Sequence, residues 1–520
     1  MPDSITIPFG PELLATLLAL LALIALSLWS GLLPSLLGDR FGQGWGRLPA
    51  TARAVLGTLG ALWGALLLVS VAAGIAGALA LVANPGAGGL GLGALLVALL
   101  GAPFLIWGTA IRQTTLDYQR EGHITDRIAK AVEQLGAEKT VKVPVKKGKT
   151  AERSEPNIEV RLGAILSLER IAQDSTRLDN GRDHVRVMEI LCAYIRENSN
   201  ARAPRDFPLP DWEPLKEDAT VEERNAHLAW RGARFGGWVD DVGVIQPSIR
   251  DWAETLPEPR ADVQLALDVI GRRSADQRAV EAAWPDPPGA GAEWVFDRAF
   301  PRLPEEPGED PLPRDDLAAF RTGLGVWKRA LRAYHGYRLD LRGANLQRAD
   351  MSGRCFAGAL LQGARMEGAG LRRARMEGAD LRRARMEGAN LEGARMEAAD
   401  LRRARMEGAG LRRARMEAAD LEGARMEGAD LRRARMDVDT SLTAATLRGA
   451  AVRDVSLPEG LLSTEQIATM FGDGSVTLPG IAPGGEGWPA HWPTRELGMH
   501  EFYYEWRKWQ ADPEGYRPPD

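Results

Sequence analysis

Histidine and cysteine are the side chains that most often carry nucleophilic, acid–base or metal chemistry, and this chain of 520 residues holds six His and two Cys. None of the His residues lies in an HExxH motif, a metal-binding pair or a nucleophile elbow. Two acid and His neighbours, Glu121 with His123 and Asp183 with His184, are interpreted as solvated or structural pairs. The sequence therefore predicts no catalytic residue, no cofactor and no metal ligand, and we expect a protein that is not an enzyme.

The cysteines and the overall charge add little to this interpretation. Cys192 and Cys355 form no zinc motif, and two free thiols suit a reducing compartment. The formal net charge of −5 over the whole chain indicates no special class of partner.

Arginine and glutamate have the most regular spacing of all charged residues. Between residues 361 and 437, Arg recurs every twenty residues in two series, and Glu follows most of these Arg two positions later. The candidate interaction residues are Arg365, Arg385, Arg405, Arg425, Arg375, Arg395, Arg415 and Arg435. Arrayed guanidinium groups neutralise phosphates, whereas a Glu beside each Arg favours a solvated, self-compensated surface.

A five-residue period positions these side chains. From Leu341 to Met436 every fifth residue is Leu or Met, with one Phe at 356, and the residue two before it is nearly always Ala. A period of five fits neither an amphipathic helix nor an alternating strand. A chain that turns a corner every five residues keeps all of these apolar side chains inside.

The repeated triplets resemble the pentapeptide-repeat family, as at residues 344–346, 379–381, 389–391 and 399–401, where Ala is followed by Asp or Asn and then Leu. The resemblance implies a right-handed, four-sided (quadrilateral) parallel β-helix with four units per coil and about six coils. Residues twenty apart then stack, which assigns Leu to two opposite faces and Met to the other two. The register breaks once, at residues 437–441, and resumes one residue late.

The family also bears on partners, because some of its members imitate duplex DNA and occupy DNA-binding enzymes. That role needs a strongly negative surface, whereas residues 361–437 hold 18 Arg against 14 Asp plus Glu. Direct nucleic-acid binding is the opposite alternative, and the interleaved Glu argue against it. We expect a surface for another protein, with a regulator of a DNA-acting enzyme or a nucleic-acid binder as the alternative.

The N-terminal part predicts three transmembrane α-helices that form a membrane anchor. Residues 13–33, 54–82 and 90–111 carry no charge, and each stretch exceeds the ~20 apolar residues that span a bilayer. Arg in the loop after the first stretch and after the third predicts an outside N-terminus and cytoplasmic domains at a bacterial inner membrane, with the lipid bilayer as a partner. Two GxxxG motifs, at 60–64 and 89–93, favour packing within the bundle or between copies, so a homo-oligomer stays open.

The rest of the chain is predicted to be mainly helical. Apolar periodicity indicates helices over residues 158–171 and 185–195, and further helices are expected over 221–239, 260–283 and 315–332. A basic segment with Lys142, Lys146, Lys147 and Lys149 is either a lipid contact or a solvated hairpin. A capped helix at 461–471 and the aromatic stretch 502–506 are expected to cover the last coil.

These observations predict a multi-domain, membrane-anchored scaffold that presents a solenoid for protein–protein interaction. Its predicted parts are a transmembrane anchor at 1–111, a stalk helix with a basic loop at 112–155, a helical region at 156–335, the β-helix at 336–457 and a C-terminal cap at 458–520.

Overall fold

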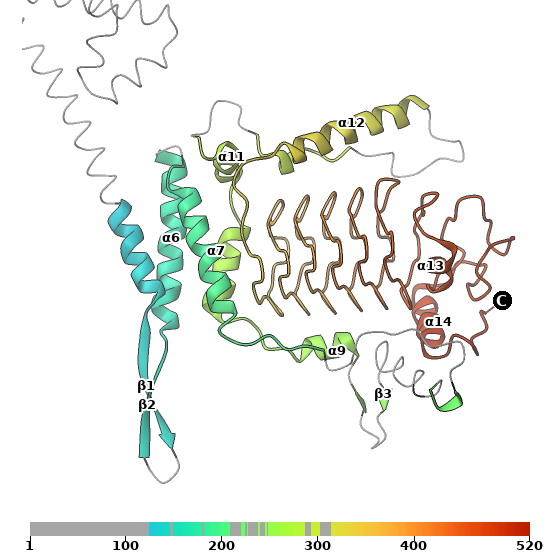
Figure 1. Ribbon diagram of the computed structural model, residues 1–520, viewed down its shortest axis with the longest axis horizontal. Helices are drawn as coiled ribbons and strands as arrows, with labels where there is room; N and C mark the ends of the chain where they lie inside the picture. Colours follow the sequence, from blue (N-terminus) through green and yellow to red (C-terminus); the bar gives the residue numbers. More distant parts are fainter. Residues whose placement is uncertain are drawn as a thin grey trace, which may run out of the picture. The chain divides into compact units, whose positions relative to one another are not determined.

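The computed structural model describes residues 124–520, apart from 146–148, 179–180, 208–219, most of 224–247, 287–292, 302–313 and 520. The described chain consists of a helical region, a β-helix and a C-terminal cap of short helices (Figure 1). Parallel β-bridges join the successive coils of the β-helix.

The predicted membrane anchor requires a correction. Within the described ranges no helix is long and apolar enough to cross a membrane. The longest of these helices, α6 (Ile158–Leu178), is interrupted by charged residues such as Arg161, Glu169 and Arg170, which a bilayer core disfavours. The three predicted spans lie outside the described residues. The predicted fold class is therefore corrected to one without transmembrane helices. The predicted inner-membrane location and lipid partner are withdrawn with it.

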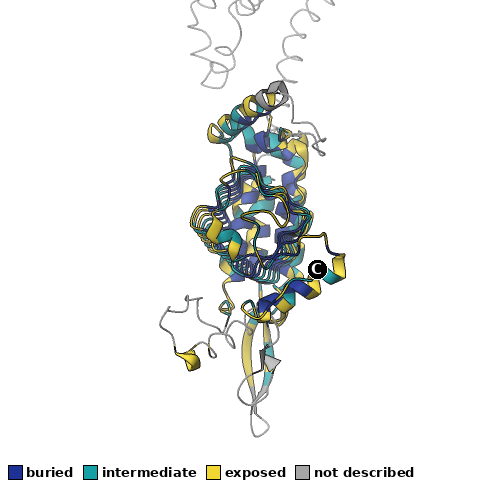
Figure 2. Cartoon of the chain, turned by 90° about the vertical axis from the view of Figure 1, so that its right-hand side faces the viewer, coloured by how far each residue is buried: buried dark blue, intermediate teal, exposed yellow. Residues whose placement is uncertain are grey.

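The β-helix has the predicted architecture. Parallel bridges join residues twenty apart, from Asp340↔Leu360 to Arg415↔Arg435, so four five-residue units complete each coil. Viewed along its axis, the solenoid is a stack of coils around one closed outline (Figure 2). The Leu and Met of the repeats are almost fully buried, and the prediction that they form the interior is confirmed.

Stacking of identical residues gives the solenoid four faces. We call them Leu face 1 (Leu361, Leu381, Leu401, Leu421), Met face 1 (Met366, Met386, Met406, Met426), Leu face 2 (Leu371, Leu391, Leu411, Leu431) and Met face 2 (Met376, Met396, Met416). On each face the two residues after the Leu or Met form the turn to the next face.

The register break also falls where the sequence predicts it. The bridge Asp420↔Ser441 spans 21 residues, and the side chain of Asp437 accepts a hydrogen bond from the backbone N–H of Ala418 at 2.8 Å, which holds the extra residue in place. Bridges continue to Ala451↔Phe471 and Ser456↔Thr477, so the coils run past residue 457. The short helix α13 (Thr464–Ala468) is inserted in the last coil and begins with the predicted cap, at Ser463.

A bundle of helices closes the N-terminal end of the β-helix. Helices α6, α7 (His184–Ser199) and α10 (Ala261–Gly271) pack together, and their apolar residues share one core with the first coils. The amide of Cys355 donates to the carbonyl oxygen of Gly271 at 2.8 Å, which joins α10 to the solenoid. Of the two structures predicted for the basic segment, a lipid contact or a hairpin, the structure has the hairpin. Strand β1 (Glu138–Val145) pairs antiparallel with β2 (Lys149–Pro156).

Some predicted helices differ in detail. The single helix expected over 260–283 is divided into α10 and α11 (Ala275–Ala283), because Ser274 starts a new helix with a capping box to Gln277. The helix expected over 315–332 is present as α12 (Arg314–Arg332). Most of 221–239 lies outside the described residues, and its end forms β3 (Trp238–Val239), paired with β4 (Ile245–Gln246).

Two segments of the helical region run along the solenoid on different sides. Helix α9 (Ile249–Glu254) follows one side, and the 3-10 helix η1 (Val295–Asp297) with α12 follows another (Figure 1). The C-terminal helix α14 (Met499–Ala511) covers the last coils, and its Trp506 Nε1 donates to the carbonyl oxygen of Gly449 at 2.9 Å. The expected aromatic cap of the solenoid is therefore present.

Candidate functional site

The candidate Arg columns lie on the two Met faces and alternate with buried Glu. The Oε1 atom of Glu367 lies 2.5 Å from Arg365 Nε and 3.1 Å from Arg385 Nε, one coil further on. On the opposite face, Glu377 lies 3.2 Å from Arg375 and 2.9 Å from Arg395. Each column is therefore a charge ladder in which one carboxylate joins two guanidinium groups of successive coils.

The sequence predicts solvated surface pairs, and this prediction is wrong for the carboxylates. The side chains of Arg365 and Arg385 are only 15% and 22% exposed. The Glu that follow the Met residues are between 0% and 6% exposed at positions 367, 377, 387, 397, 407 and 417. Burial follows from other parts of the chain, which lie across both Met faces.

Met face 1 is covered by residues 205–207 and α9. Arg365 donates through Nη2 to the carboxylate of Asp206 at 2.9 Å, and Arg385 contacts the same carboxylate at 2.6 Å. Further along, Ala253 of α9 packs against Gly368 and Gly388 so closely that a Cβ on either glycine would lie 3.1 Å or less from it.

Met face 2 is covered by η1 and α12. Arg375 donates to the carboxylate of Asp297 at 2.9 Å and to the carbonyl oxygen of Phe296 at 2.7 Å. Phe300 and Trp327 form an edge-to-face aromatic pair in a cluster that packs on Ala398 and Ala418. The eight candidate Arg therefore lie beside internal contacts of the chain, and their role as an interaction surface stays a prediction.

The ladders hold carboxylates in an unusual environment. Burial raises the pKa of Glu367, Glu377 and Glu417, although the neighbouring Arg oppose this shift. Burial, together with the like charges of Glu407 and Glu367, raises the pKa of Glu387 to about 7. Within the described chain the Oε2 atoms of Glu367 and Glu387 are buried and accept no hydrogen bond.

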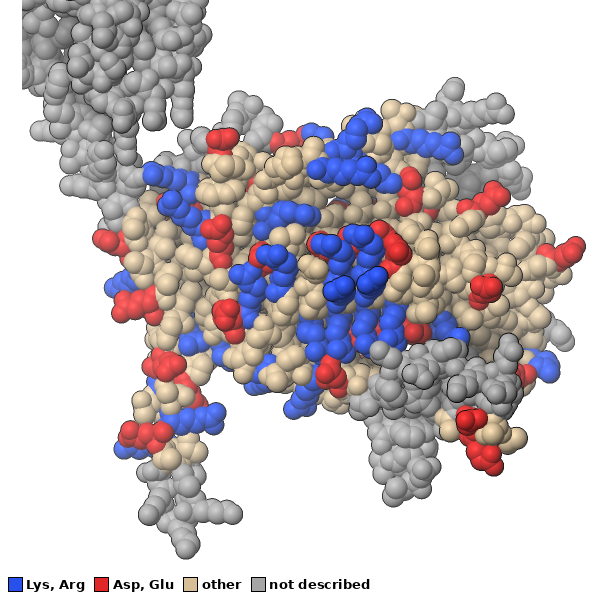
Figure 3. Space-filling view, viewed as in Figure 1, with Lys and Arg blue, Asp and Glu red and all other residues tan. Residues whose placement is uncertain are grey.

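The two Leu faces carry a second group of arginines. Their turn residues include the consecutive pairs Arg372 and Arg373, Arg382 and Arg383, Arg402 and Arg403, Arg412 and Arg413, and Arg432 and Arg433. Most of these side chains are exposed, in contrast to the ladders. One face of the solenoid in Figure 3 shows Lys and Arg gathered across the coils, with Asp and Glu between them.

The first Arg of each pair is held by an acid of its own face. Arg382 donates through Nε and Nη2 to the two oxygens of Asp380, and Arg402 does the same with Asp400. Such two-point contacts fix the guanidinium plane. The side chains of Arg382 and Arg402 are nevertheless 40% and 44% exposed.

The second Arg of each pair lies in a strained turn. The five residues have φ between 54° and 58°, the left-handed region that favours glycine. On the Met faces the same turn position holds Gly or Ala, as at Gly368 and Ala398. Among the described residues no ion-pair partner is found for the members of this group that lie at 373, 383, 403 and 413. Exposed, strained Arg without an ion pair therefore mark the Leu faces. The sequence signal for them is an Arg at the turn position that holds Gly or Ala on the Met faces.

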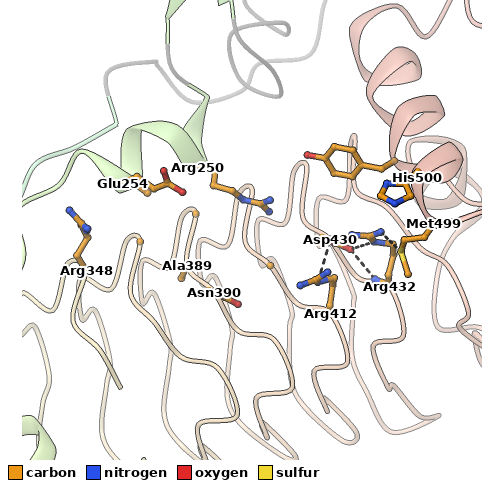
Figure 4. Close-up of a pocket in the computed structure, with 15 residues that line it drawn as sticks. Arg250, Glu254, Arg348, Ala389, Asn390, Arg412, Asp430, Arg432, Met499 and His500 are labelled. Atoms are coloured by element: carbon orange, nitrogen blue, oxygen red, sulfur yellow. Dashed lines mark hydrogen bonds and ion pairs between the residues drawn. The ribbon is translucent and has the colours of Figure 1, made fainter. Parts of the chain in front are cut away.

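A groove of 570 Å³ lies on Leu face 2 between α9 and α14 (Figure 4). Its floor includes Asn390 and Gly410, and its ends are formed by Arg348 and by Met499 of α14. The regular repeat alone predicts no pocket on the solenoid. The groove was missed because it needs two helices that lie outside the repeats.

The remaining polar candidates have structural roles. His184 is fully buried, and its Nε2 lies 2.9 Å from Glu281, so its partner is α11 and not the neighbouring Asp183. Burial raises the pKa of Cys192 to about 12, which keeps the thiol protonated. Glu121 and His123 lie outside the described residues. In the described part of the chain no group of three His, Cys, Asp or Glu is placed to hold a metal ion.

The coils, their left-handed turns and their four stacked faces define a β-solenoid protein. The family model of pentapeptide repeats matches in eight copies over residues 356–388, 379–417 and 399–437. The chain belongs to the pentapeptide-repeat family. Solenoids of this family often mediate protein–protein interaction.

Three solved structures illustrate the relationship. The chain is 28% identical to the pentapeptide repeat protein Rfr23 from the cyanobacterium Cyanothece 51142 (16% of this chain, 62% of that chain, TM-score 0.16). It is 27% identical to HetL, involved in heterocyst differentiation regulation in Nostoc sp. strain PCC 7120 (27% and 65%, TM-score 0.13). It is 30% identical to a pentapeptide repeat protein of the Arabidopsis thaliana thylakoid lumen (23% and 71%, TM-score 0.12). The first two relatives are thus covered over less than two thirds of their length. No curated protein matches the chain.

Proposed function

We propose that this protein is a non-enzymatic scaffold whose solenoid binds an acidic surface of another protein through its two Leu faces. The observation that carries the proposal is the contrast between the faces. Both Met faces are covered by the chain's own α9, η1 and α12, whereas the Leu faces present exposed Arg.

The strained turns support this choice of surface. A residue other than Gly in the left-handed region costs about 1 kcal/mol or more. Arg383 and Arg403 occupy such turns on successive coils of Leu face 1, and Arg373 and Arg413 occupy them two coils apart on Leu face 2. These side chains gain no ion pair within the described chain that offsets the strain. Contact with an external carboxylate is a stabilising role that fits their position.

The mixed charge of the faces favours protein over nucleic acid. Asp380 and Asp400 each hold an Arg on Leu face 1, so acids interrupt the basic row at every coil. A duplex presents phosphates without interruption and would meet these carboxylates. A protein surface with its own mixture of charges can pair with both.

The test uses variants that preserve the fold. Arg383→Gly with Arg403→Gly, and Arg373→Gly with Arg413→Gly, place the favoured residue in each left-handed turn, so lost binding cannot follow from unfolding. The control, Arg170→Ala with Arg186→Ala, removes the same charge from exposed positions on α6 and α7. Each chain is the bait in quantitative affinity capture, carried out with and without nuclease treatment.

We expect a defined protein partner to be retained by the wild type and the control and to be reduced by at least one of the two solenoid variants. Capture that is equal in all four chains would refute a role for the Leu faces. Loss of the partner on nuclease treatment would favour the nucleic-acid alternative.

A further inference from the structure

The floor of the groove on Leu face 2 includes a departure from the repeat pattern. In the column that precedes the buried Leu or Met of this face, Asp350, Asn390 and Asp430 carry side chains, whereas positions 370 and 410 hold Gly. A Cβ on Gly410 would have no neighbour closer than 3.9 Å, the distance to Ala389 O and Asn390 Oδ1. The floor at this coil is therefore open backbone with room for a side chain that the protein itself lacks.

The lining of the groove is predominantly basic. Four guanidinium groups, of Arg250, Arg348, Arg412 and Arg432, face two carboxylates, of Glu254 and Asp430. In Figure 4, Arg250 comes from α9 on one side, while Arg412 and Arg432 come from successive coils. The net charge of this lining is +2, counting each guanidinium as +1 and each carboxylate as −1, so it attracts an anionic ligand.

The four Arg differ in how many of their N–H donors already bond to other residues of the protein. Arg432 is buried and donates to both oxygens of Asp430, at 2.8 and 2.7 Å. Arg412 is 45% exposed and contacts Glu392 at 3.0 Å. Arg250 donates to the carbonyl oxygen of Gly408 at 3.2 Å and has no carboxylate partner among the described residues. Arg348 donates to the carbonyl oxygen of Leu256 at 2.8 Å and contacts Glu258 at 3.2 Å. Arg250, which has no carboxylate partner among the described residues, and Arg412, which is the most exposed of the ion-paired groups, are the two Arg that we assign to a ligand.

The end of the groove at α14 adds a hydroxyl donor. Tyr503 is 40% exposed, and its hydroxyl oxygen accepts a hydrogen bond from Arg507 at 3.0 Å. Because this bond uses a lone pair, the hydroxyl proton stays available for an acceptor on a ligand. Met499 provides apolar surface beside it.

We propose that this groove binds an extended, acidic peptide segment of the partner protein, so the inference rests on the proposed function and specifies the chemistry of its partner. Arg348 and Asp430 lie about four coils apart, which at ~4.8 Å per coil gives about 19 Å, the length of about six extended residues. Carboxylates of the segment pair with Arg250 and Arg412, and its backbone lies over Gly410.

The deciding variant is Gly410→Asp. It introduces the residue type that the next coil has at Asp430, adds a Cβ with no neighbour closer than 3.9 Å, and places a carboxylate on the floor of the groove. Ser441→Asp adds the same charge on Leu face 1, where Asp420 already lies in the preceding coil. The two variants therefore have equal net charge and differ in the position of the added carboxylate.

The probe is a fluorescein-labelled hexaglutamate peptide, titrated into the full-length protein and followed by fluorescence anisotropy, with hexaglutamine and a hexathymidine oligonucleotide as competitors. We expect Gly410→Asp to weaken hexaglutamate binding by about tenfold or more and Ser441→Asp to leave it within about twofold of the wild type. Neither competitor is expected to displace the peptide.

Equal binding by the wild type and Gly410→Asp would overturn the assignment to the groove. Displacement by the oligonucleotide at lower concentration than by unlabelled hexaglutamate would show a preference for nucleic acid and would also overturn it. The Arg→Gly variants of the turn positions leave the groove floor unchanged, so the two experiments test different surfaces. If those variants lose the protein partner but the peptide does not bind the groove, the groove proposal is rejected and the proposed scaffold function is retained.

Discussion

The Oε1 atom of Glu387 lies 2.9 Å from the Nε atom of Arg405, which belongs to the next coil of the solenoid. The same carboxylate contacts Arg385 of its own coil at 3.1 Å. Buried ion pairs that join successive coils make the spacing of the coils depend on charge as well as on backbone hydrogen bonds. Each coil of Met face 1 is therefore coupled electrostatically to the next.

The first prediction concerns the pH dependence of stability. Since the pKa of Glu387 is raised in the folded protein to about 7, this carboxyl binds a proton more tightly when folded than when unfolded. Its contribution to the free energy of unfolding therefore falls as the pH rises from about 4.5 to about 7, by up to about 3 kcal/mol. Glu387→Gln removes this titration. We expect the urea midpoint of the wild type to decline relative to Glu387→Gln between pH 5 and pH 8.

The control for this prediction is Glu422→Gln, because Glu422 is exposed on Leu face 1. Its urea midpoint should follow the wild type at every pH. Parallel curves for the wild type and Glu387→Gln across the whole range would show that Glu387 is ionised in the folded protein at all these pH values.

The second prediction concerns the strained turns. Arg403 has a φ of 57°, and Arg403→Gly should raise the free energy of unfolding by about 0–1 kcal/mol, since relief of strain exceeds the entropy that Gly adds to the unfolded chain. Arg402 precedes it outside the left-handed region, is held by Asp400, and Arg402→Gly should destabilise the protein. Thermal unfolding of the two variants compares the positions directly. A lower melting temperature for Arg403→Gly than for Arg402→Gly would refute the strain argument.

The sequence predicted the interior of the solenoid because that interior depends on local spacing. Leu381 and Met386 point inward for the same reason as their equivalents in every coil, and a bridge to the residue twenty positions away is enough to bury them. The shift at Asp437 was predictable on the same basis. Stacking needs only the period and no knowledge of distant segments.

The sequence did not predict the burial of Glu387 or the groove, since both depend on contacts across long stretches of chain. Ala253 covers the turn at Gly388, and nothing in the repeat indicates that α9 returns to it. One local signal of the groove was nevertheless present, because Gly410 interrupts a column that holds Asp or Asn in other coils. The division of residues 260–283 into two helices also had a local signal, the capping box from Ser274 to Gln277 that starts α11.

The third prediction tests the contact between α9 and Met face 1. Gly388 has a φ of 66°, and an added Cβ would lie 2.8 Å from the Cβ of Ala253. Gly388→Ala should therefore displace α9 in addition to straining the turn. Gly363 has the same φ of 66° with nothing within 4 Å, so Gly363→Ala carries only the strain of about 1 kcal/mol.

Hydrogen exchange measures this difference. Amides of α9 should exchange faster in Gly388→Ala than in Gly363→Ala, while amides of α12, on the other Met face, should be equal in both. If α9 were protected equally in the two variants, the close contact with Ala253 would not be the one that holds the helix on the solenoid.

The fourth prediction concerns the cap on the last coils. Trp506 is 1% exposed and packs in one cluster with Phe471 and Phe502, and its indole N–H satisfies the carbonyl of Gly449. Trp506→Ala should lower the free energy of unfolding by about 3–5 kcal/mol and release α14 from the coil that it covers.

An uncovered coil presents unpaired backbone groups to a second molecule. We expect Trp506→Ala to self-associate with increasing concentration in sedimentation velocity, whereas Tyr504→Ala, at a side chain that is 66% exposed, should sediment as the wild type does. A Trp506→Ala protein with the oligomeric state of the wild type at all concentrations would mean that the remaining cap contacts suffice to protect the end of the solenoid.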